Sequence, residues 1–193
     1  MEKVHLKKGI SAPALWNSVR QYFAKHVTDP RNNNGNEKIS IESTMLSASA
    51  VFALKFPSLL QFDQHEEERE IKHNLKTLFG VQQTPCDTQM REIIDQIEPE
   101  EIEGAFDVVF AQAQRNKVLE DYAFLDRGYL LSIDGTGYFE STEIHCESCC
   151  VKQSRNGPKS FYHQFLPAVI VHPNQKQVIP LRSRAYFQAR WCH

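Results

Sequence analysis

Hydrophobic residues recur at helical spacing through roughly the first 120 residues of the chain. Residues 12–27 carry apolar side chains three or four positions apart, which predicts a helix with one buried face. Ser11 is suited to cap this helix, and Pro13 suits its first turn. We therefore expect residues 1–125 to form a helical region. Further helices are predicted at about residues 43–55, 58–79, 87–97 and 99–120.

The helices expected at residues 87–97 and 99–120 admit two interpretations. Asp87 or Thr88 can cap the first, and Pro99 suits the first turn of the second. Two short helices joined by a tight turn are also the arrangement that enters the major groove in helix-turn-helix proteins. This pair carries only three Lys or Arg residues among many acids, so a plain helical bundle is favoured.

From Gly128 onward the period shortens, and the chain alternates between apolar runs and turn residues. The run at 129–133 predicts a buried strand, and residues 160–173 predict a long apolar strand. A turn at residues 174–175 then allows residues 176–182 to pair back as a hairpin. The pattern predicts an α+β chain, helical first and β-rich afterwards.

Asp134 follows the run at 129–133 and precedes Gly135-Thr136-Gly137. Asp-Gly is a common hairpin turn, which gives Asp134 a purely structural interpretation. A carboxylate at the end of a buried strand is otherwise paired, hydrogen-bonded or bound to a metal. Mg²⁺ prefers such oxygen ligands, and two-metal phosphoryl transfer requires several converging carboxylates. Asp134 is therefore the candidate catalytic and magnesium-binding residue.

The composition favours a protein that works in a reducing compartment. The chain has five cysteines, an odd number, and two of them are neighbours. No run of 18 apolar residues is present, so no membrane span is expected, and the N-terminus lacks the apolar core of a signal peptide. These features predict a cytoplasmic location.

Charge is distributed unevenly along the chain. The formal net charge is -2, yet all 24 acidic residues lie at or before Glu147. The charged residues within 151–193 are therefore all Lys or Arg. A basic segment in an acidic chain indicates either an anionic partner, with nucleic acid the usual one, or pairing with the acidic part of the same chain. The candidate DNA-binding residues are Lys152, Arg155, Lys159 and Lys176.

Soft metal ligands cluster just before this basic segment. His145-Cys146-x-x-Cys149-Cys150 contains one Cys-x-x-Cys pair, which is half of a typical zinc site. The second half must come from elsewhere, because the chain has no second such pair. The alternative is a set of ordinary reduced cysteines on a loop. Candidates to complete the site are His163, His172 and the terminal Cys192-His193.

Two long stretches resemble a known family. LLSIDGTGYFESTEIHCESCCVK (130–152) and NGPKSFYHQFLPAVIVHPNQKQVIPL (156–181) are similar to the start of the catalytic domain of DDE transposases from bacterial insertion sequences. FPSLLQFD (56–63) and TPCDTQMREIIDQI (84–97) resemble the helical N-terminal region of the same proteins. The resemblance covers roughly residues 40–181.

The resemblance implies a ribonuclease-H-like fold, with residues 126–181 as its first three strands. Asp134 matches the first catalytic Asp, and the chemistry implied is Mg²⁺-dependent DNA cleavage and strand transfer at insertion-sequence ends. The N-terminal helices are expected to bind DNA. Self-association, or association with a full-length transposase, is expected in addition.

The chain departs from the family pattern after the first Asp. A DDE site needs two further acids on later elements, and no Asp or Glu follows Glu147. None of the three acids after Asp134, which are Glu140, Glu143 and Glu147, is expected to substitute, because loop residues rarely reach catalytic geometry by chance. Residues 182–193 form a divergent tail, as a frameshift or an early stop would produce. The expected protein is an inactive transposase fragment that at most binds DNA.

Two alternatives remain from the sequence. The first is a working transposase or nuclease whose site is completed in trans or by frameshifting. The second is a zinc-stabilised interaction module built around residues 145–150.

Overall fold

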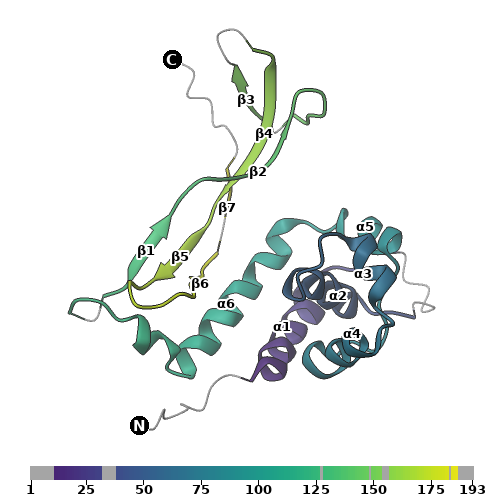
Figure 1. The fold of residues 1–193 in the computed structure, drawn as a ribbon, viewed down its shortest axis with the longest axis horizontal. Coiled ribbons are helices and arrows are strands. Elements are labelled where there is room, and N and C mark those ends of the chain that lie inside the picture. The colour runs from purple at the N-terminus through teal and green to yellow at the C-terminus, as the bar shows by residue number, and fades with distance from the viewer. Residues whose placement is uncertain are drawn as a thin grey trace. The chain divides into compact units, whose positions relative to one another are not determined.

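Helices form the first part of the chain and antiparallel strands the second, so the protein belongs to the α+β class (Figure 1). The structure is a computed structural model, and it divides into two compact units, Met1–Val118 and Leu119–His193. The residues that it describes are 11–31, 38–126, 128–147, 149–153, 157–182 and 184–186.

The first unit is helical, as the hydrophobic spacing predicted, but the single helix expected at residues 58–79 is divided into three shorter elements. None of the described helices is both long enough and apolar enough to cross a membrane. The helices are α1 (Ala12–His26), α2 (Ile41–Ala53), α3 (Leu59–His65), α4 (Arg69–Asn74), the π-helix η1 (Leu75–Phe79), α5 (Asp87–Ile94) and α6 (Pro99–Arg115). The 3-10 helix η2 (Val118–Tyr122) follows α6.

Serine residues begin three of these helices. The hydroxyl of Ser11 accepts a hydrogen bond from the backbone N–H of Ala14 at 3.3 Å, which confirms the predicted cap of α1. Ser40 and Ser58 cap α2 and α3 in the same way. These bonds satisfy backbone donors that would otherwise lack a partner in the first turn.

Two expectations about helix ends are wrong. Neither Asp87 nor Thr88 caps α5, because the helix already begins at Asp87 and its cap position is Cys86, which makes no side-chain capping bond. Helix α6 ends at Arg115 rather than near residue 120. Lys117 takes a positive φ of 61°, which ends regular α-helical geometry before η2 begins.

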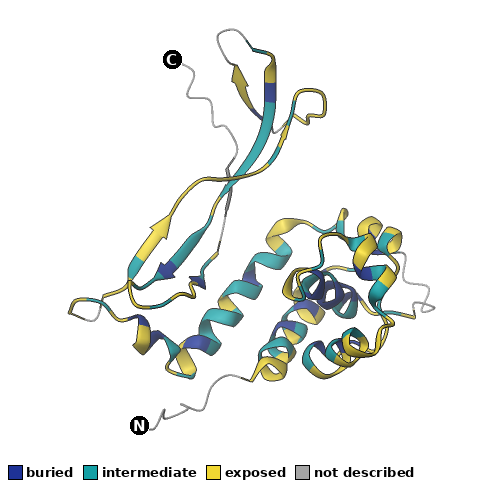
Figure 2. Cartoon of the chain, in the orientation of Figure 1, coloured by how far each residue is buried: buried dark blue, intermediate teal, exposed yellow. Residues whose placement is uncertain are grey.

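The core of the first unit forms around α2 (Figure 2). Leu46 is 0% exposed, and Phe62 and Met90 are each 1% exposed. Two polar residues of α2, Thr44 and Ser47, are also fully buried. Their hydroxyls donate to helix carbonyls one turn earlier, so burial leaves no unpaired hydroxyl.

Arg20 joins three helical elements of this unit. Its guanidinium, on α1, donates to the hydroxyl of Ser43 on α2 at 3.2 Å and to the carbonyl of Gly80 at 2.8 Å. Gly80 takes a φ of 68°, the left-handed conformation that favours glycine at a helix end. Gly80 therefore ends η1, and Arg20 satisfies a carbonyl that η1 leaves free.

The carboxyl group of Glu66, just after α3, has a raised pKa. Burial raises its pKa to about 7 from 4.5, and the neighbouring charges of Asp63 and Glu67 add to the rise, while Lys72 opposes it. Its Oε2 atom is buried and has no hydrogen-bond partner among the described residues. The folded state therefore favours the protonated carboxyl group.

We predict that Glu66→Gln removes a pH-dependent loss of stability. The folded pKa is raised, so stability is full below pH 4.5 and is lost as the pH rises from 4.5 to about 7. Because the residue is only partly buried, solvent screening reduces the expected gain at pH 8 to about 1 kcal/mol. Urea unfolding of the wild-type protein and of Glu66→Gln at pH 4 and pH 8 measures the gain in the free energy of unfolding. Equal gains at both pH values would contradict this account.

The second unit contains two antiparallel sheets. One has the order β1-β5-β6, and the other has the order β2-β4-β3, with β7 also paired to β4. The strands are β1 (Leu130–Ile133), β2 (Thr136–Ser141), β3 (Cys150–Gln153), β4 (Lys159–Leu166), β5 (Ala168–Val171), β6 (Ile179–Pro180) and β7 (Arg184–Tyr186).

Strand pairing differs from the sequence expectation in two places. The stretch at 160–173 forms two strands in different sheets, separated by Pro167, which has no N–H to donate to a ladder. β1 pairs with β5, and β2 pairs with β4, so Asp134-Gly135 is not the turn of a β1–β2 hairpin. The return of the chain after residues 174–175 is confirmed by the antiparallel pairing of β5 with β6.

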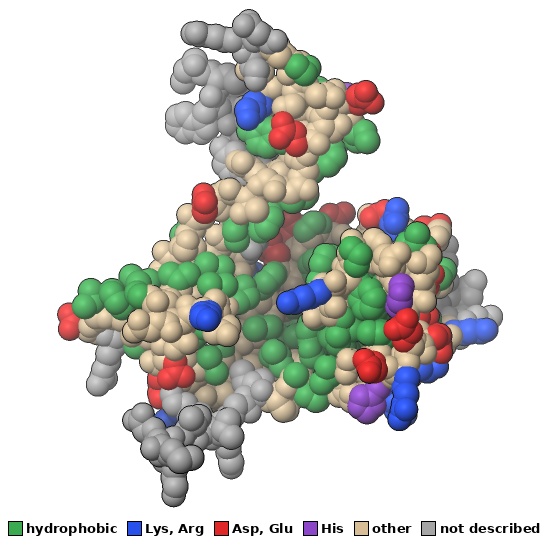
Figure 3. Space-filling view, viewed as in Figure 1, with side chains coloured by type: hydrophobic (Ala, Val, Ile, Leu, Met, Phe, Trp, Pro, Cys, Tyr) green, Lys and Arg blue, Asp and Glu red, His purple; other side chains and the backbone are tan. Residues whose placement is uncertain are grey.

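β1 is less buried than its apolar sequence predicted. Leu131 is 56% exposed and Ile133 is 64% exposed, whereas Ile170 on the paired strand is 3% exposed. Hydrophobic side chains are visible at the surface in the region of this strand (Figure 3). β1 is an edge strand within the described part of this sheet, where it pairs with β5 alone.

Candidate metal centre

Three of the soft ligands singled out in the sequence converge in the second unit. Cys146 and Cys149 lie on the loop between β2 and β3, and His163 lies on β4. The Sγ atoms of both cysteines are 3.2 Å from Nε2 of His163, and they are 3.6 Å from each other. All three potential ligand atoms lie within 4.8 Å of one another.

These distances fit one tetrahedral zinc ion. With bonds of about 2.3 Å to sulfur and about 2.0 Å to nitrogen, tetrahedral geometry places two sulfurs about 3.8 Å apart and a sulfur and a nitrogen about 3.5 Å apart. The observed separations are within a few tenths of an ångström of these values. The sulfur–sulfur distance of 3.6 Å is far longer than the roughly 2.05 Å of a disulfide.

The loop reaches this geometry through a tight turn. The N–H of Cys149 donates to the carbonyl of Cys146 at 3.2 Å, and the N–H of Cys146 donates to the Sγ atom of Cys149 at 3.2 Å. Earlier in the loop, the hydroxyl of Ser141 accepts from the N–H groups of Glu143 and Ile144. These local bonds, together with the contacts of both sulfurs with His163, hold the loop against β4.

The cysteines influence each other electrostatically. The N–H of Cys146 lowers the pKa of Cys149, but desolvation, the hydrogen bond and charge of Cys146, and the charge of Cys150 outweigh it and raise that pKa. Two neighbouring thiolates repel each other without a cation between them. A divalent cation relieves that repulsion, and its binding releases protons.

Aromatic rings hold the histidine of the cluster. The ring of His163 stacks on Tyr138, with centroids 5.8 Å apart, and lies at the same distance from Phe139. This packing fixes the ring of His163 in a half-buried position. Its Nε2 atom faces the two cysteines.

The other soft ligands named in the sequence do not join the cluster. His145 stacks on the ring of Phe161, with centroids 4.2 Å apart, instead of facing the sulfurs. Cys150 is fully buried at the start of β3. His172 contacts Phe124 and accepts from the N–H of Asn174. The terminal Cys192-His193 lies outside the described residues.

Asp134 lies directly after β1 and is exposed. Its carboxylate accepts a hydrogen bond from the N–H of Gly135 at 2.7 Å. No group of three potential metal ligands among the described residues includes it. Glu140, the nearest acid along the chain, lies in β2 opposite Tyr162.

The candidate DNA-binding lysines fall in two places. Lys152 is the penultimate residue of β3, and Lys159 is the first residue of β4. The ammonium group of Lys159 lies over the ring of Phe161, 5.2 Å from its centroid. Lys176 lies instead between β5 and β6, and Arg155 is outside the described residues.

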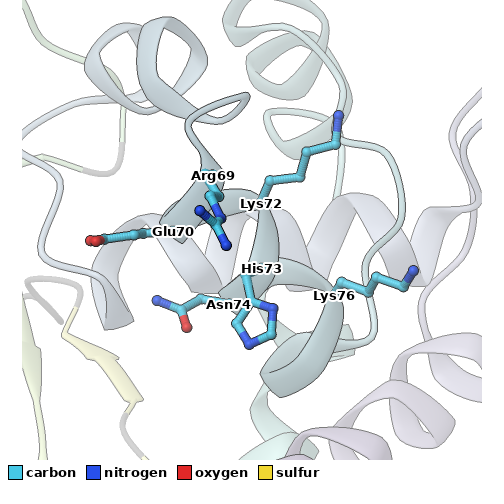
Figure 4. Close-up of a pocket in the computed structure, with 6 residues that line it drawn as sticks. All are labelled: Arg69, Glu70, Lys72, His73, Asn74 and Lys76. Atoms are coloured by element: carbon cyan, nitrogen blue, oxygen red, sulfur yellow. The ribbon is translucent and has the colours of Figure 1, made fainter.

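A second concentration of cations occurs in the first unit. Figure 4 shows a surface pocket whose labelled side chains all come from α4 and η1, and Arg69, His73 and Asn74 lie close together there. Lys72, another lining residue, forms an ion pair with Glu67, and Glu70 also lines the pocket. The acids offset the cations, so this pocket is a weaker candidate than the cysteine cluster.

The fold and this site define an α+β protein with a candidate Cys₂His metal centre in its β-rich unit. No family model, no curated protein and no solved structure matches the chain. The chemistry of the site therefore follows from its own ligands, two cysteines and one histidine.

Proposed function

We propose that this chain is a fragment of a DDE transposase that binds DNA, lacks a complete carboxylate site and carries a structural Zn²⁺ on Cys146, Cys149 and His163. The observation that carries the zinc assignment is the convergence of three ligand atoms at zinc-like separations. The DNA-binding assignment rests on the resemblance and on the acid-free segment after Glu147.

The position of Asp134 supports the transposase origin. In the family that the sequence resembles, the first strand carries the first catalytic Asp, and antiparallel strands come after it. Here Asp134 follows β1, which pairs antiparallel with β5, and β5 pairs antiparallel with β6. This order of elements is compatible with the start of a ribonuclease-H-like sheet.

The lack of further acids supports an inactive site. Two-metal phosphoryl transfer needs carboxylates that converge on both ions. Asp134 is followed only by Glu140, Glu143 and Glu147 within the 193 residues, and none of them forms a ligand group with it in the described part of the chain. Mg²⁺ would therefore bind Asp134 weakly and without the second ion.

The zinc ion would serve folding. When bound, it supplies a cross-link that joins the loop after β2 to β4, in place of a larger hydrophobic core. Cys146 and Cys149 would bind as thiolates and His163 through Nε2. The fixed ring of His163 and the tight turn of the cysteines prepare this geometry.

We expect no metal-dependent DNA cleavage by the purified chain. Supercoiled plasmid incubated with the chain and Mg²⁺ or Mn²⁺ should remain intact, and Asp134→Ala should behave identically, because a single carboxylate cannot hold two ions. Anisotropy with a labelled duplex should nevertheless detect binding that weakens with salt. Cleavage that disappears in Asp134→Ala would instead establish a complete site, assembled between polypeptides.

A further inference from the structure

We propose that the hairpin of β3 and β4 is a basic ribbon that enters the major groove of duplex DNA, and that the metal at its base fixes the ribbon. The basic ribbon is defined as Cys150–Gln153 with its paired residues Lys159–Tyr162. The inference rests on the proposed function. It specifies that the β3–β4 ribbon contacts DNA and that the bound metal fixes the geometry of the ribbon.

The pairing pattern leaves the end of the ribbon two-stranded. β3 pairs with β4 from Cys150↔Tyr162 to Gln153↔Lys159. On the other side of β4, pairing with β2 ends at Ser141↔Phe161, so Lys159 and Ser160 pair with β3 alone. In Figure 1, β3 and the adjoining end of β4 extend past the end of β2. A two-stranded ribbon is one of the elements that the major groove admits.

The charges of the ribbon suit both walls of a groove. Lys152 pairs with Ser160, and Lys159 pairs with Gln153, so the two lysines belong to adjacent cross-strand pairs. Adjacent pairs project to opposite faces of a sheet. An inserted ribbon would therefore direct one lysine toward each phosphate backbone. No acid follows Glu147 in the sequence, so no carboxylate on the ribbon opposes these contacts.

The metal ligands lie immediately below the ribbon. Cys149 directly precedes the first residue of β3, and His163 directly follows the last residue of β4 that pairs with β3. An ion bound to Cys149 and His163 would link the two strands one position beyond the last pair, Cys150↔Tyr162. Without the ion, the two strands can separate at this end, and the lysines lose their fixed spacing.

Duplex DNA fits this surface better than a single strand. Single-strand binding relies on exposed aromatic rings that stack with bases. Phe161 is stacked against His145, and His163 against Tyr138, so one face of each of these rings is already covered by another ring. The available contacts are those of ammonium groups with phosphates.

The test measures DNA affinity of the full chain at several salt concentrations, with a labelled duplex and the variants Lys152→Gln and Lys159→Gln. Each variant should reduce the slope of log K against log salt by about 0.9, as expected for one lost phosphate contact. Lys55→Gln is the matched control, because it removes the same charge from an exposed position just beyond α2 in the first unit and should leave the slope unchanged. Bound zinc should stay at the wild-type level in all three.

The metal dependence is tested with the same duplex. Cys146→Ser combined with Cys149→Ser should lose zinc and weaken binding by about tenfold, in the range of one or two lost phosphate contacts. Circular dichroism checks that the helices of the first unit persist.

Each component can fail separately. Unchanged slopes in both lysine variants, with wild-type protein that binds DNA and holds zinc, would overturn the ribbon and leave the proposed function intact. Unchanged affinity of the zinc-free variant would overturn the role of the metal. Preference for single-stranded DNA or RNA would overturn the duplex assignment, and wild-type protein that binds no DNA would overturn the proposed function as well.

Discussion

Purified protein is expected to contain about one equivalent of zinc, and replacing Cys146 and Cys149 with serine should abolish it. A serine hydroxyl is not deprotonated near neutral pH and is a poor zinc ligand, so the double variant keeps only His163. Structural zinc in small domains contributes about 10 kcal/mol or more to apparent folding free energy. Elemental analysis measures the loss of zinc. Thermal unfolding, followed in the near ultraviolet, measures the loss of stability.

Three other variants separate metal ligation from ordinary packing. Cys86→Ser changes an exposed cysteine of the first unit and should leave the zinc content unchanged, while serine at the cap position of α5 should raise stability slightly. Cys150→Ser places a hydroxyl in a fully buried position, so it should lower stability while zinc is retained. His145→Ala should retain zinc, since that ring stacks on Phe161. Full zinc in the Cys146→Ser, Cys149→Ser protein would refute the centre.

Local sequence signals were sufficient to predict most of the helical unit. The spacing of apolar residues located α1 and α2, and Ser11 marked the start of α1. The cap of α5 was mispredicted because Asp87 has the preferred chemistry but already lies inside the helix. A cap depends on backbone conformation at one position, which composition does not determine.

The strands were harder to predict because their environment depends on partners distant in sequence. Leu131 and Ile133 have the composition of a buried strand, yet both side chains are exposed, whereas Ile170 on the paired strand is buried. Pro167 divides one apolar run between two sheets. Apolar composition reports propensity for a strand, whereas burial is decided by what packs over it.

The candidate site was visible in the sequence only in part. Cys146 and Cys149 follow from their spacing, since three positions suffice to bring two sulfurs together in a turn. The third ligand was left open among three possibilities because it depends on strand register. The pairing of Phe139 with His163 brings the histidine beside the β2–β3 loop, and a shift of one residue would send its ring to the opposite face.

Gly104→Ala is expected to destabilise the first unit by about 1–3 kcal/mol, although alanine normally favours a helix over glycine by about 1 kcal/mol. Gly104 is buried in α6, where a Cβ atom would lie 2.3 Å from the hydroxyl oxygen of Tyr22 and 2.6 Å from its Cζ atom. That ring cannot move freely. Its hydroxyl donates to the carbonyl of Glu101 at 2.9 Å, and the ring stacks on His26 with centroids 4.6 Å apart.

The sign of this effect should reverse when the tyrosine ring is removed. In a Tyr22→Ala background nothing opposes the added methyl group, so Gly104→Ala should become neutral or stabilise by up to about 1 kcal/mol through helix propensity alone. Urea unfolding followed by circular dichroism at the helical signal measures all four proteins of the cycle. A cost that persists without the tyrosine would show that backbone strain in α6, rather than the close approach of α1, requires glycine at this position.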